Sequence, residues 1–472
     1  MALVLSKQGY LIKNTGILAI GSFSSKILVF LLVPIYTSVL TTGEYGDYDI
    51  IFSSISLLIP ILSLNISDAV LRFPLDKDAD IPRIAHIGIS LTLVSGCIIL
   101  LCQLIPNMPW SGLRGLNYLA PLYVANALYQ LLVALARGAE KMLDIAIAGI
   151  VSTLVVVTAN IVFLLVFKWG LDGFFIANIL GVFLPCVYLL LRMKCIVFSR
   201  GRTSKDGLLK KMIRYSVPLA MVTIGWWFIN ASGRYIVLAF CGMDETGLFS
   251  IAFKIPSILN VLSGIFIQAW QVSAIKEFDK EDSDGFLSGT FENVEMLLVL
   301  ACSGLIILSP VLASVLYADE FYQAWVYVPF LLVSVLLNTM GGIWGPFFSA
   351  NYHTTPLTIA TILGGAANIA IGIPLVMAFG TVGAVISSVV ASAVNWLYRG
   401  VRVKRLINVN FHMIRSSVIY AILLLQGIIM VIGLPLVIWL SADCLLFLGF
   451  LFVYRRRLRS ALSFMAGLLK RR

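Results

Sequence analysis

The chain has 472 residues, of which 60% are hydrophobic and only 12% are charged, and its mean hydropathy is +0.98. A soluble domain usually carries about 25% charged residues, so this composition excludes a water-soluble protein and predicts a polytopic membrane protein. The net charge of +11 does not indicate nucleic-acid binding, because the basic residues alternate with apolar segments and form no single patch.

Apolar segments of about 20 residues follow one another along the whole chain, and each is long enough to cross the hydrocarbon core as a helix. The first segment contains Lys26 and leads directly into further spans, so we interpret it as a span and not as a cleavable signal. The predicted fold is all-α with about 14 transmembrane helices. The expected spans are residues 14–37, 48–70, 84–105, 116–136, 143–167, 171–191, 215–240, 246–270, 294–316, 325–350, 356–379, 381–399, 414–432 and 434–454.

Lysine and arginine lie mainly on one side of these spans. With this span list, 29 of the 34 basic residues fall on the side of the two termini, and only Arg114 and Lys168 fall on the opposite side. Cytoplasmic loops are enriched in lysine and arginine, so we predict that both termini are cytoplasmic. The three remaining cations, Lys26, Arg234 and Lys254, lie inside spans.

Two short motifs recur after about six spans. Residues 44–48 and 245–249 both read Glu-x-Gly-x-aromatic, and residues 170–173 and 380–383 share a Gly-x-x-Gly pattern. Two sets of six spans in the same orientation form a parallel repeat, and transporters with such repeats bind their substrate near the midplane between the halves. The repeat therefore favours a transporter.

At these residues the chain resembles the polysaccharide and oligosaccharide flippases of the MOP exporter superfamily, relatives of Wzx, MurJ and the MATE transporters. The resemblance lies in residues 39–48 (VLTTGEYGDY), 215–219 (YSVPL) and 247–254 (GLFSIAFK), and in the number and spacing of spans. It implies two six-helix lobes around a central cleft plus two C-terminal helices. The implied division is an N-lobe (1–191), a basic cytoplasmic linker (192–214), a C-lobe (215–405), and two helices with a basic tail (406–472).

The resemblance also implies a function. Such a protein turns a lipid-linked oligosaccharide of the undecaprenyl-diphosphate type from the cytoplasmic to the outer leaflet of the bacterial plasma membrane by alternating access. The product would serve O-antigen, capsule or exopolysaccharide synthesis, with membrane lipids around the protein and a polysaccharide polymerase and glycosyltransferases as possible partners. No cofactor is implied, and no nucleic-acid partner.

The intramembrane cations are the first candidate site residues. A cation near the bilayer centre costs roughly 2.5–3.5 kcal/mol, so Lys26, Arg234 and Lys254 in three separate spans suggest a shared polar cavity. At about 1.5 Å per residue they lie about 16, 10 and 14 Å from the outer ends of their spans. Arginine and lysine suit a diphosphate, so we expect these residues to bind it. Arg234 is also compatible with snorkelling to the outer headgroups.

Polar residues on the same helices are candidates for binding the glycan. Trp227 and Asn230 share a helix face with Arg234, and Ser257 and Gln268 continue a polar and small stripe from Lys254. An aromatic ring and hydrogen-bonding groups suit a sugar. Small and polar residues also occur at ordinary helix-packing positions, and packing remains the alternative interpretation, including for Trp227.

Acids and basic residues at the inner ends are less specific. Arg72 either meets the substrate at the cytoplasmic entrance or fixes the topology, and Asp68 is the near-membrane acid that we would test for ion coupling. Glu292 and Glu295 are expected at the inner edge of the ninth span, in contact with water. The three histidines are isolated and no cysteines form a CxxC pair, so we expect no metal site.

Two other functions compete with the flippase. A MATE-type multidrug or cation antiporter usually needs a buried acid in its cavity, whereas the midplane charges here are basic. A membrane enzyme such as a glycan polymerase or glycosyltransferase needs a substantial loop or domain, and the loops here are short. We therefore expect a transporter and no enzyme.

Overall fold

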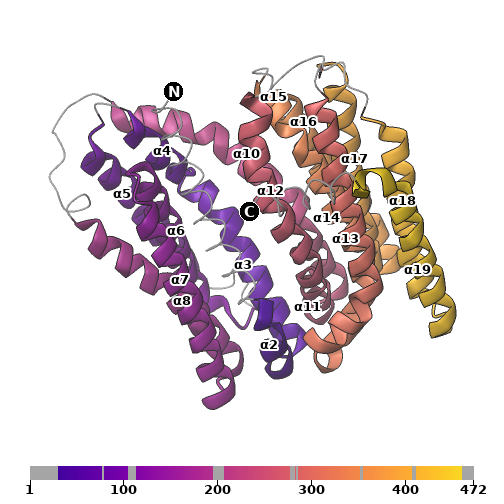
Figure 1. The fold of residues 1–472 in the computed structure, drawn as a ribbon. Helices are drawn as coiled ribbons and strands as arrows, with labels where there is room; N and C mark the ends of the chain where they lie inside the picture. Colours follow the sequence, from indigo (N-terminus) through magenta and orange to yellow (C-terminus); the bar gives the residue numbers. More distant parts are fainter. Residues whose placement is uncertain are drawn as a thin grey trace, which may run out of the picture. The chain divides into compact units, whose positions relative to one another are not determined.

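The structure is a computed structural model that describes residues 30–76, 79–104, 113–194, 207–276, 282, 285–350, 355–406 and 411–459. Within these residues every regular element is helical, as the sequence predicts (Figure 1). The α-helices are α2 (Val33–Val39), α3 (Thr42–Leu62), α4 (Ile66–Arg72), α5 (Ile81–Gln103), α6 (Leu119–Gly138), α7 (Met142–Asn160), α8 (Gly170–Arg192), α10 (Leu208–Cys241), α11 (Met243–Ala252), α12 (Lys254–Lys276), α13 (Phe286–Leu316), α14 (Val328–Ile343), α15 (Gly345–Ala350), α16 (Thr355–Phe379), α17 (Thr381–Val403), α18 (Met413–Val431) and α19 (Leu436–Val453). Short 3-10 or π segments are η1 (Phe73–Leu75), η2 (Leu116–Tyr118), η3 (Ile161–Val166) and η4 (Asp319–Tyr327).

Thirteen helical segments of the described chain are long and apolar enough to cross a membrane, the first at Thr42–Leu62 and the last at Leu436–Val453. They correspond one by one to the second through fourteenth spans predicted from the sequence. The first predicted span, residues 14–37, lies mostly outside the described residues, and its described end contributes to α2. The protein is therefore a multi-pass membrane protein.

The helices divide into two compact units, and α10 begins in the first and ends in the second. Unit 1 also contains two short segments from later in the chain, the start of α11 and the end of α13. Unit 1 comprises Met1–Trp227, Met243–Gly247 and Leu316–Glu320, and unit 2 comprises Phe228–Gly242, Leu248–Val315 and Phe321–Arg472.

The core of unit 1 forms where α4, α5, α6 and α8 meet. Val70, Leu131 and Leu189 are fully buried there and belong to one hydrophobic cluster. Gly88 on α5 allows the close packing, because a Cβ at this position would lie 2.7 Å from the side chain of Val70 and 2.9 Å from that of Leu131. This packing holds the short helix α4 against α5 and α6.

The first repeated motif builds the start of α3. Thr41 is the N-cap, and its side chain accepts a hydrogen bond from the backbone N–H of Glu44 at 3.2 Å, while the Glu44 carboxylate accepts one from the Thr41 N–H at 3.0 Å. This capping box satisfies two donors that a helix start leaves without partners. The Thr-x-x-Glu spacing in the sequence therefore fixes where the second span begins.

The second copy of the motif occupies the same helical positions and lies against the first. Glu44 and Glu245 are the third residues of α3 and α11, and Gly46 and Gly247 are the fifth. A Cβ on Gly247 would overlap the carbonyl oxygen of Thr42, and one on Gly46 would lie 2.5 Å from the carbonyl oxygen of Met243. The Thr42 hydroxyl also donates to the Asp244 carboxylate at 2.9 Å. We call this contact between residues 42–46 and 243–247 the glycine contact.

Unit 2 buries polar side chains between its helices. Ser334 on α14 hydrogen-bonds Ser392 on α17 at 2.8 Å, and Asn368 on α16 donates to the carbonyl of Ile229 on α10 at 3.2 Å. Ser387 on α17 in turn donates to the side-chain oxygen of Asn368 at 3.0 Å. Such bonds between transmembrane helices satisfy groups that lipid cannot, so these residues are best explained by helix packing.

The prediction that Glu295 contacts water is wrong. Glu295 is only 2% exposed, and its carboxyl accepts hydrogen bonds from the hydroxyls of Tyr420 on α18 at 3.0 Å and Tyr454 after α19 at 3.3 Å. Glu292 is also mostly covered, because it forms an ion pair with Arg457. These acids fasten the two C-terminal helices to α13, and the sequence pattern could not reveal this because their partners lie more than 100 residues away.

A methyl group at the glycine contact should prevent its formation. In a cysteine-free background with Thr42→Cys and Asp244→Cys, we expect oxidation to join the two positions readily. Adding Gly247→Ala should reduce the cross-linked fraction several-fold, because overlap with a backbone oxygen costs about 1–3 kcal/mol. Gly149→Ala is the control, since nothing lies within 4 Å of a Cβ there. Equal cross-linking in both glycine variants would contradict the described packing.

Removing one hydroxyl from the Glu295 cluster should destabilise the attachment of α18 and α19. A hydrogen bond to a carboxylate contributes about 1.5–3 kcal/mol, so Tyr420→Phe should lower the thermal unfolding midpoint of the purified protein measurably. Tyr322→Phe serves as the matched control because Tyr322 is 39% exposed. If both variants unfold at the same temperature, the bond to Glu295 does not hold these helices.

Candidate functional site

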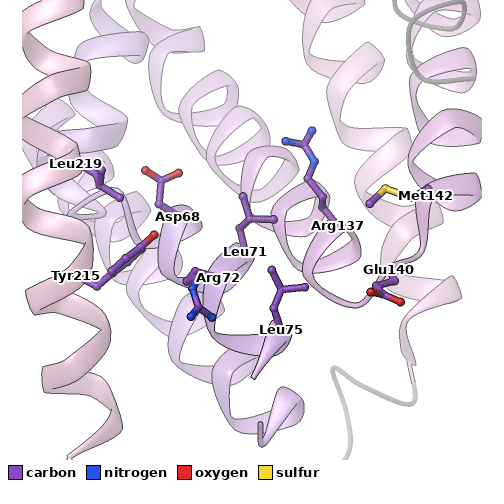
Figure 2. A pocket seen from close by; sticks show the side chains of 9 residues that line it. All are labelled: Asp68, Leu71, Arg72, Leu75, Arg137, Glu140, Met142, Tyr215 and Leu219. Carbon is purple, nitrogen blue, oxygen red and sulfur yellow. The ribbon is translucent and has the colours of Figure 1, made fainter. Parts of the chain in front are cut away.

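A cavity of about 530 Å³ opens in unit 1, at the ends of α4 and α6 and the start of α10. Figure 2 shows side chains from three places around it, namely α4 with η1, the corner between α6 and α7, and the first turns of α10. The lining combines apolar, aromatic and charged groups, and it includes both residues that the sequence analysis named at the inner ends. The lining residues are Asp68, Leu71, Arg72, Leu75, Arg137, Glu140, Met142, Tyr215 and Leu219.

A break between α3 and α4 positions Asp68 at this cavity. Leu64 and Asn65 both adopt the left-handed conformation, with φ of 53° and 52°, so the chain turns sharply after the second span. Asn65 then donates a hydrogen bond to the Asp68 carboxylate at 2.7 Å. Non-glycine residues in this conformation cost about 1–3 kcal/mol each. Such a cost is commonly found at functional sites, and the break presents an acid to the cavity.

Burial changes the protonation of Asp68. The desolvation of its carboxyl raises the pKa of Asp68, and the hydrogen bond from Asn65 opposes this only in part. A group with a raised pKa beside an accessible cavity is a candidate for proton binding.

The two arginines of the cavity come from the ends of neighbouring helices. Arg72 lies in the last turn of α4 and Arg137 in the last turn of α6, where the helix dipole favours a cation. Arg72 donates to Asp76 at 2.7 Å, with both side chains more than half exposed. Arg137 forms no ion pair with any described residue. The sequence analysis missed Arg137 because it counted this residue only as a determinant of topology.

Two of the three predicted diphosphate ligands, Arg234 and Lys254, belong to unit 2. The guanidinium carbon of Arg234 on α10 lies 5.0 Å from the centre of the Phe253 ring, and Phe253 directly precedes Lys254. Arg234 also donates to the backbone carbonyl of Asn230 at 2.7 Å. Both cations are partly buried. The third predicted ligand, Lys26, lies outside the described residues.

Lys254 lies within the eighth span, directly after a one-residue irregularity at Phe253. α11 ends at Ala252 and α12 begins at Lys254, with Pro256 two residues further on. The chain stays helical at this point, because Phe253 has φ of −74° and ψ of −10° and its carbonyl accepts a hydrogen bond from the Ser257 N–H at 3.0 Å. The Ser257 hydroxyl donates to the Lys254 carbonyl. The structure thus places Lys254 directly after the residue whose ring contacts Arg234.

The predicted glycan residues have different surroundings. The Trp227 indole N–H donates to the carbonyl of Ser53 on α3 at 2.8 Å, so packing against α3 accounts for this residue. Asn230 is exposed on α10, one turn before Arg234. Gln268 lies on α12, and its side chain is outside the described part of the structure.

A further buried cation escaped the sequence analysis. Arg399 on α17 is only 4% exposed and donates to the carbonyl of Gly341 at 3.3 Å and to the Thr361 hydroxyl at 3.2 Å. These bonds join α14, α16 and α17, which gives the residue a packing role. Among the described residues, no group of three histidine, cysteine, aspartate or glutamate side chains is arranged to hold a metal ion.

Comparison with known proteins identifies the family. Residues 11–271, more than half of the chain, match the family of polysaccharide biosynthesis proteins. The chain belongs to this family. A relative at 22% identity over 340 residues is the probable low-salt glycan biosynthesis flippase Agl15 of Haloferax volcanii, and the match covers 69% of each chain.

Solved structures share the fold. The lipid II flippase MurJ in an inward closed conformation has a TM-score of 0.69 at 14% identity, covering 93% of this chain and 99% of MurJ. An inward-facing multidrug resistance MATE transporter of the MOP superfamily has a TM-score of 0.65 at 15% identity, covering 81% of this chain and 95% of the MATE chain. At these identities the likeness shows the fold alone, and that fold is the one that the sequence resemblance implies.

The protonation of Asp68 should be visible in the stability of the protein. The raised pKa means that the folded protein binds more protons than the unfolded chain above the ordinary value of about 3.9. Stability from this group therefore falls as pH rises from that value through the raised pKa. We expect Asp68→Asn to flatten this part of the pH dependence, measured as the unfolding midpoint from about pH 4 to about pH 8.

The control for this measurement is Glu140→Gln, which removes an exposed acid from the same cavity. This variant should retain the pH dependence of the unmodified protein. An Asp68→Asn profile that coincides with the Glu140→Gln profile would show that the Asp68 carboxyl is not perturbed.

Proposed function

We propose that this protein flips a polyprenyl-diphosphate-linked oligosaccharide from the cytoplasmic to the outer leaflet of a bacterial plasma membrane. Membership of the polysaccharide biosynthesis family and the fold shared with a lipid flippase support this function. The observation that carries it is the contact of Arg234 with the ring of Phe253, the residue directly before Lys254, within the eighth span. Its charge suits an anionic substrate.

The chemistry of a diphosphate fits these groups. Arginine offers paired donors in a planar arrangement, and lysine offers a compact charge with three donors. Because the site lies within a span, little water competes for these groups, and each interaction is stronger than at the surface. In our proposal Lys26 supplies the third cation.

Transport then follows from alternating access. The diphosphate is bound by cations near the midplane, while the lipid tail stays in the hydrocarbon and the sugars occupy a polar passage. Asn230 and Ser257 offer hydrogen-bonding groups beside the cations, and Gln268 extends the same stripe along α12. The positive charges offset the cost of bringing a diphosphate to this depth. Both termini remain cytoplasmic in this scheme, as the loop charges predict.

The experiment replaces each cation by glutamine. We expect Lys26→Gln, Arg234→Gln and Lys254→Gln to reduce export of the glycan at least tenfold in a flippase-deficient bacterium or in proteoliposomes, since a charged hydrogen bond contributes about 1.5–3 kcal/mol. Membrane expression should be unchanged. Arg402→Gln is the control, because Arg402 lies in the last turn of α17 and packs against Tyr398.

Full export by all three single variants would contradict the diphosphate site. A MATE-type antiporter is the second candidate, because the fold is equally that of a multidrug transporter. Expression in a host that lacks drug efflux separates the two functions. Resistance to cationic drugs without any effect on glycan export would favour the antiporter.

A further inference from the structure

The cavity in unit 1 combines groups that play no part in the proposed diphosphate site near the midplane. Its apolar groups, such as Leu71 and Leu75, lie beside two arginines, an exposed tyrosine and two acids. The cavity is formed by the ends of α4 and α6 and the start of α10 (Figure 2). By the distribution of basic residues these ends face the cytoplasm, which is the side from which a substrate would enter.

The wall that carries the two arginines is tightly packed. Gly138 at the end of α6 lies so close to α4 that a Cβ there would be 2.8 Å from the carbonyl oxygen of Leu71 and 3.1 Å from that of Val70. Val70 itself is fully buried in the core of unit 1. The backbones that bear Arg72 and Arg137 are therefore held at a fixed spacing, which is what a binding site needs.

The chemistry of the lining selects one kind of ligand. Arg72 and Arg137 provide guanidinium donors, of which the pair with Asp76 at 2.7 Å engages only one group of Arg72. An exposed ion pair of this type contributes little, about 0–1 kcal/mol, so a phosphate replaces it at small cost. Carboxylates such as Asp68 accept hydrogen bonds from sugar hydroxyls, and the ring of Tyr215 is 41% exposed.

Tyr215 is fixed in place by its neighbours. Its ring meets Phe73 edge to face, with ring centres 5.9 Å apart, and it is the α10 contribution to the cavity nearest to Arg72 in Figure 2. A sugar packs its C–H face on an aromatic ring held in this way. A lipid-linked glycan has three parts at its reducing end, namely phosphate, sugar and alkyl chain. In the cavity the arginines suit the phosphate, Tyr215 suits the sugar, and the leucines suit the alkyl chain.

We propose that this cavity is a loading site, where Arg72 and Arg137 bind the phosphates of the lipid-linked glycan and Tyr215 contacts its first sugar before the substrate reaches the midplane. The proposal rests on the flippase function and adds a second binding site at a different depth. The two sites share no residue, because the cavity is lined by unit 1 alone whereas Arg234 and Lys254 belong to unit 2.

The test uses purified protein in phosphatidylcholine nanodiscs with undecaprenyl diphosphate N-acetylglucosamine as the probe. We expect Arg137→Gln to weaken binding about tenfold or more, and Arg72→Gln to act in the same direction, since a charged hydrogen bond contributes about 1.5–3 kcal/mol. Arg137→Lys should restore most of the affinity. Arg214→Gln is the matched control, an exposed arginine on α10 that does not line the cavity.

A second arm identifies the source of the phosphate. Replacing the probe by phosphatidylglycerol should give weak binding that is the same for Arg137→Gln and Arg214→Gln. If Arg137→Gln weakens the binding of both lipids by the same factor, the proposal is overturned, because the cavity would then be a site for ordinary anionic lipid. A thermal unfolding midpoint within the range of the control excludes misfolding as the cause of weak binding.

Transport kinetics separate this proposal from the proposed function. A loading-site variant should raise the substrate concentration needed for half-maximal flipping, with a nearly unchanged maximal rate, whereas Lys254→Gln should lower the maximal rate. If the unmodified protein flips the probe and Arg137→Gln and Arg72→Gln flip it with unchanged kinetics, the loading site is wrong while the flippase function stands. If the unmodified protein does not flip the probe, the function itself fails.

Discussion

The close approach of two backbones at the glycine contact is the constraint on which the packing of α3 against the start of α11 depends. At Gly247 even a methyl group would overlap the carbonyl oxygen of Thr42, and Gly46 leaves almost no more room beside Met243. Small residues permit such close approach of transmembrane helices. The Thr41–Glu44 capping box starts α3 one turn before Gly46, so the motif both begins a helix and presents a surface without side chains. In the second copy the N-cap is Gly242, which makes no side-chain capping bond, so the close approach at glycine is the role that both copies share.

The second pair of repeated glycines has a related explanation. Gly170 and Gly380 stand at the starts of α8 and α17 with positive φ of 55° and 58°, a conformation that favours glycine. Gly383 faces the carbonyl of Leu375 too closely for any side chain, and Gly173 approaches the carbonyl of Phe163. Each unit therefore contains the same tight turn between two of its spans, which is the structural form of the six-span period seen in the sequence.

The sequence predicts the spans well and the interior poorly. Hydropathy located thirteen described spans because lipid demands about 20 apolar residues in each. It did not locate the break at Leu64 and Asn65, since neither residue is a glycine, nor the burial of Glu295, whose tyrosine partners lie on two distant helices. The cations within spans, Arg234 and Lys254, stay a predicted site, and the fold shows Arg234 against Phe253, the residue before Lys254. The sequence analysis did not single out Arg137, because it counted this residue among the many basic residues between spans.

Buried charge in this protein divides into two classes by its partners. Arg399 and Glu295 make hydrogen bonds to groups within their own unit, so removing either residue would leave buried polar atoms unsatisfied. Arg72 and Arg137 sit at helix ends beside an open cavity, where water now solvates them. A charge that is solvated in the resting protein loses little when a ligand replaces that water, whereas a charge already bonded within the protein must first break its bonds. Ligand binding is therefore less costly at the exposed arginines of the cavity than at Arg399, whose bonds would first have to break.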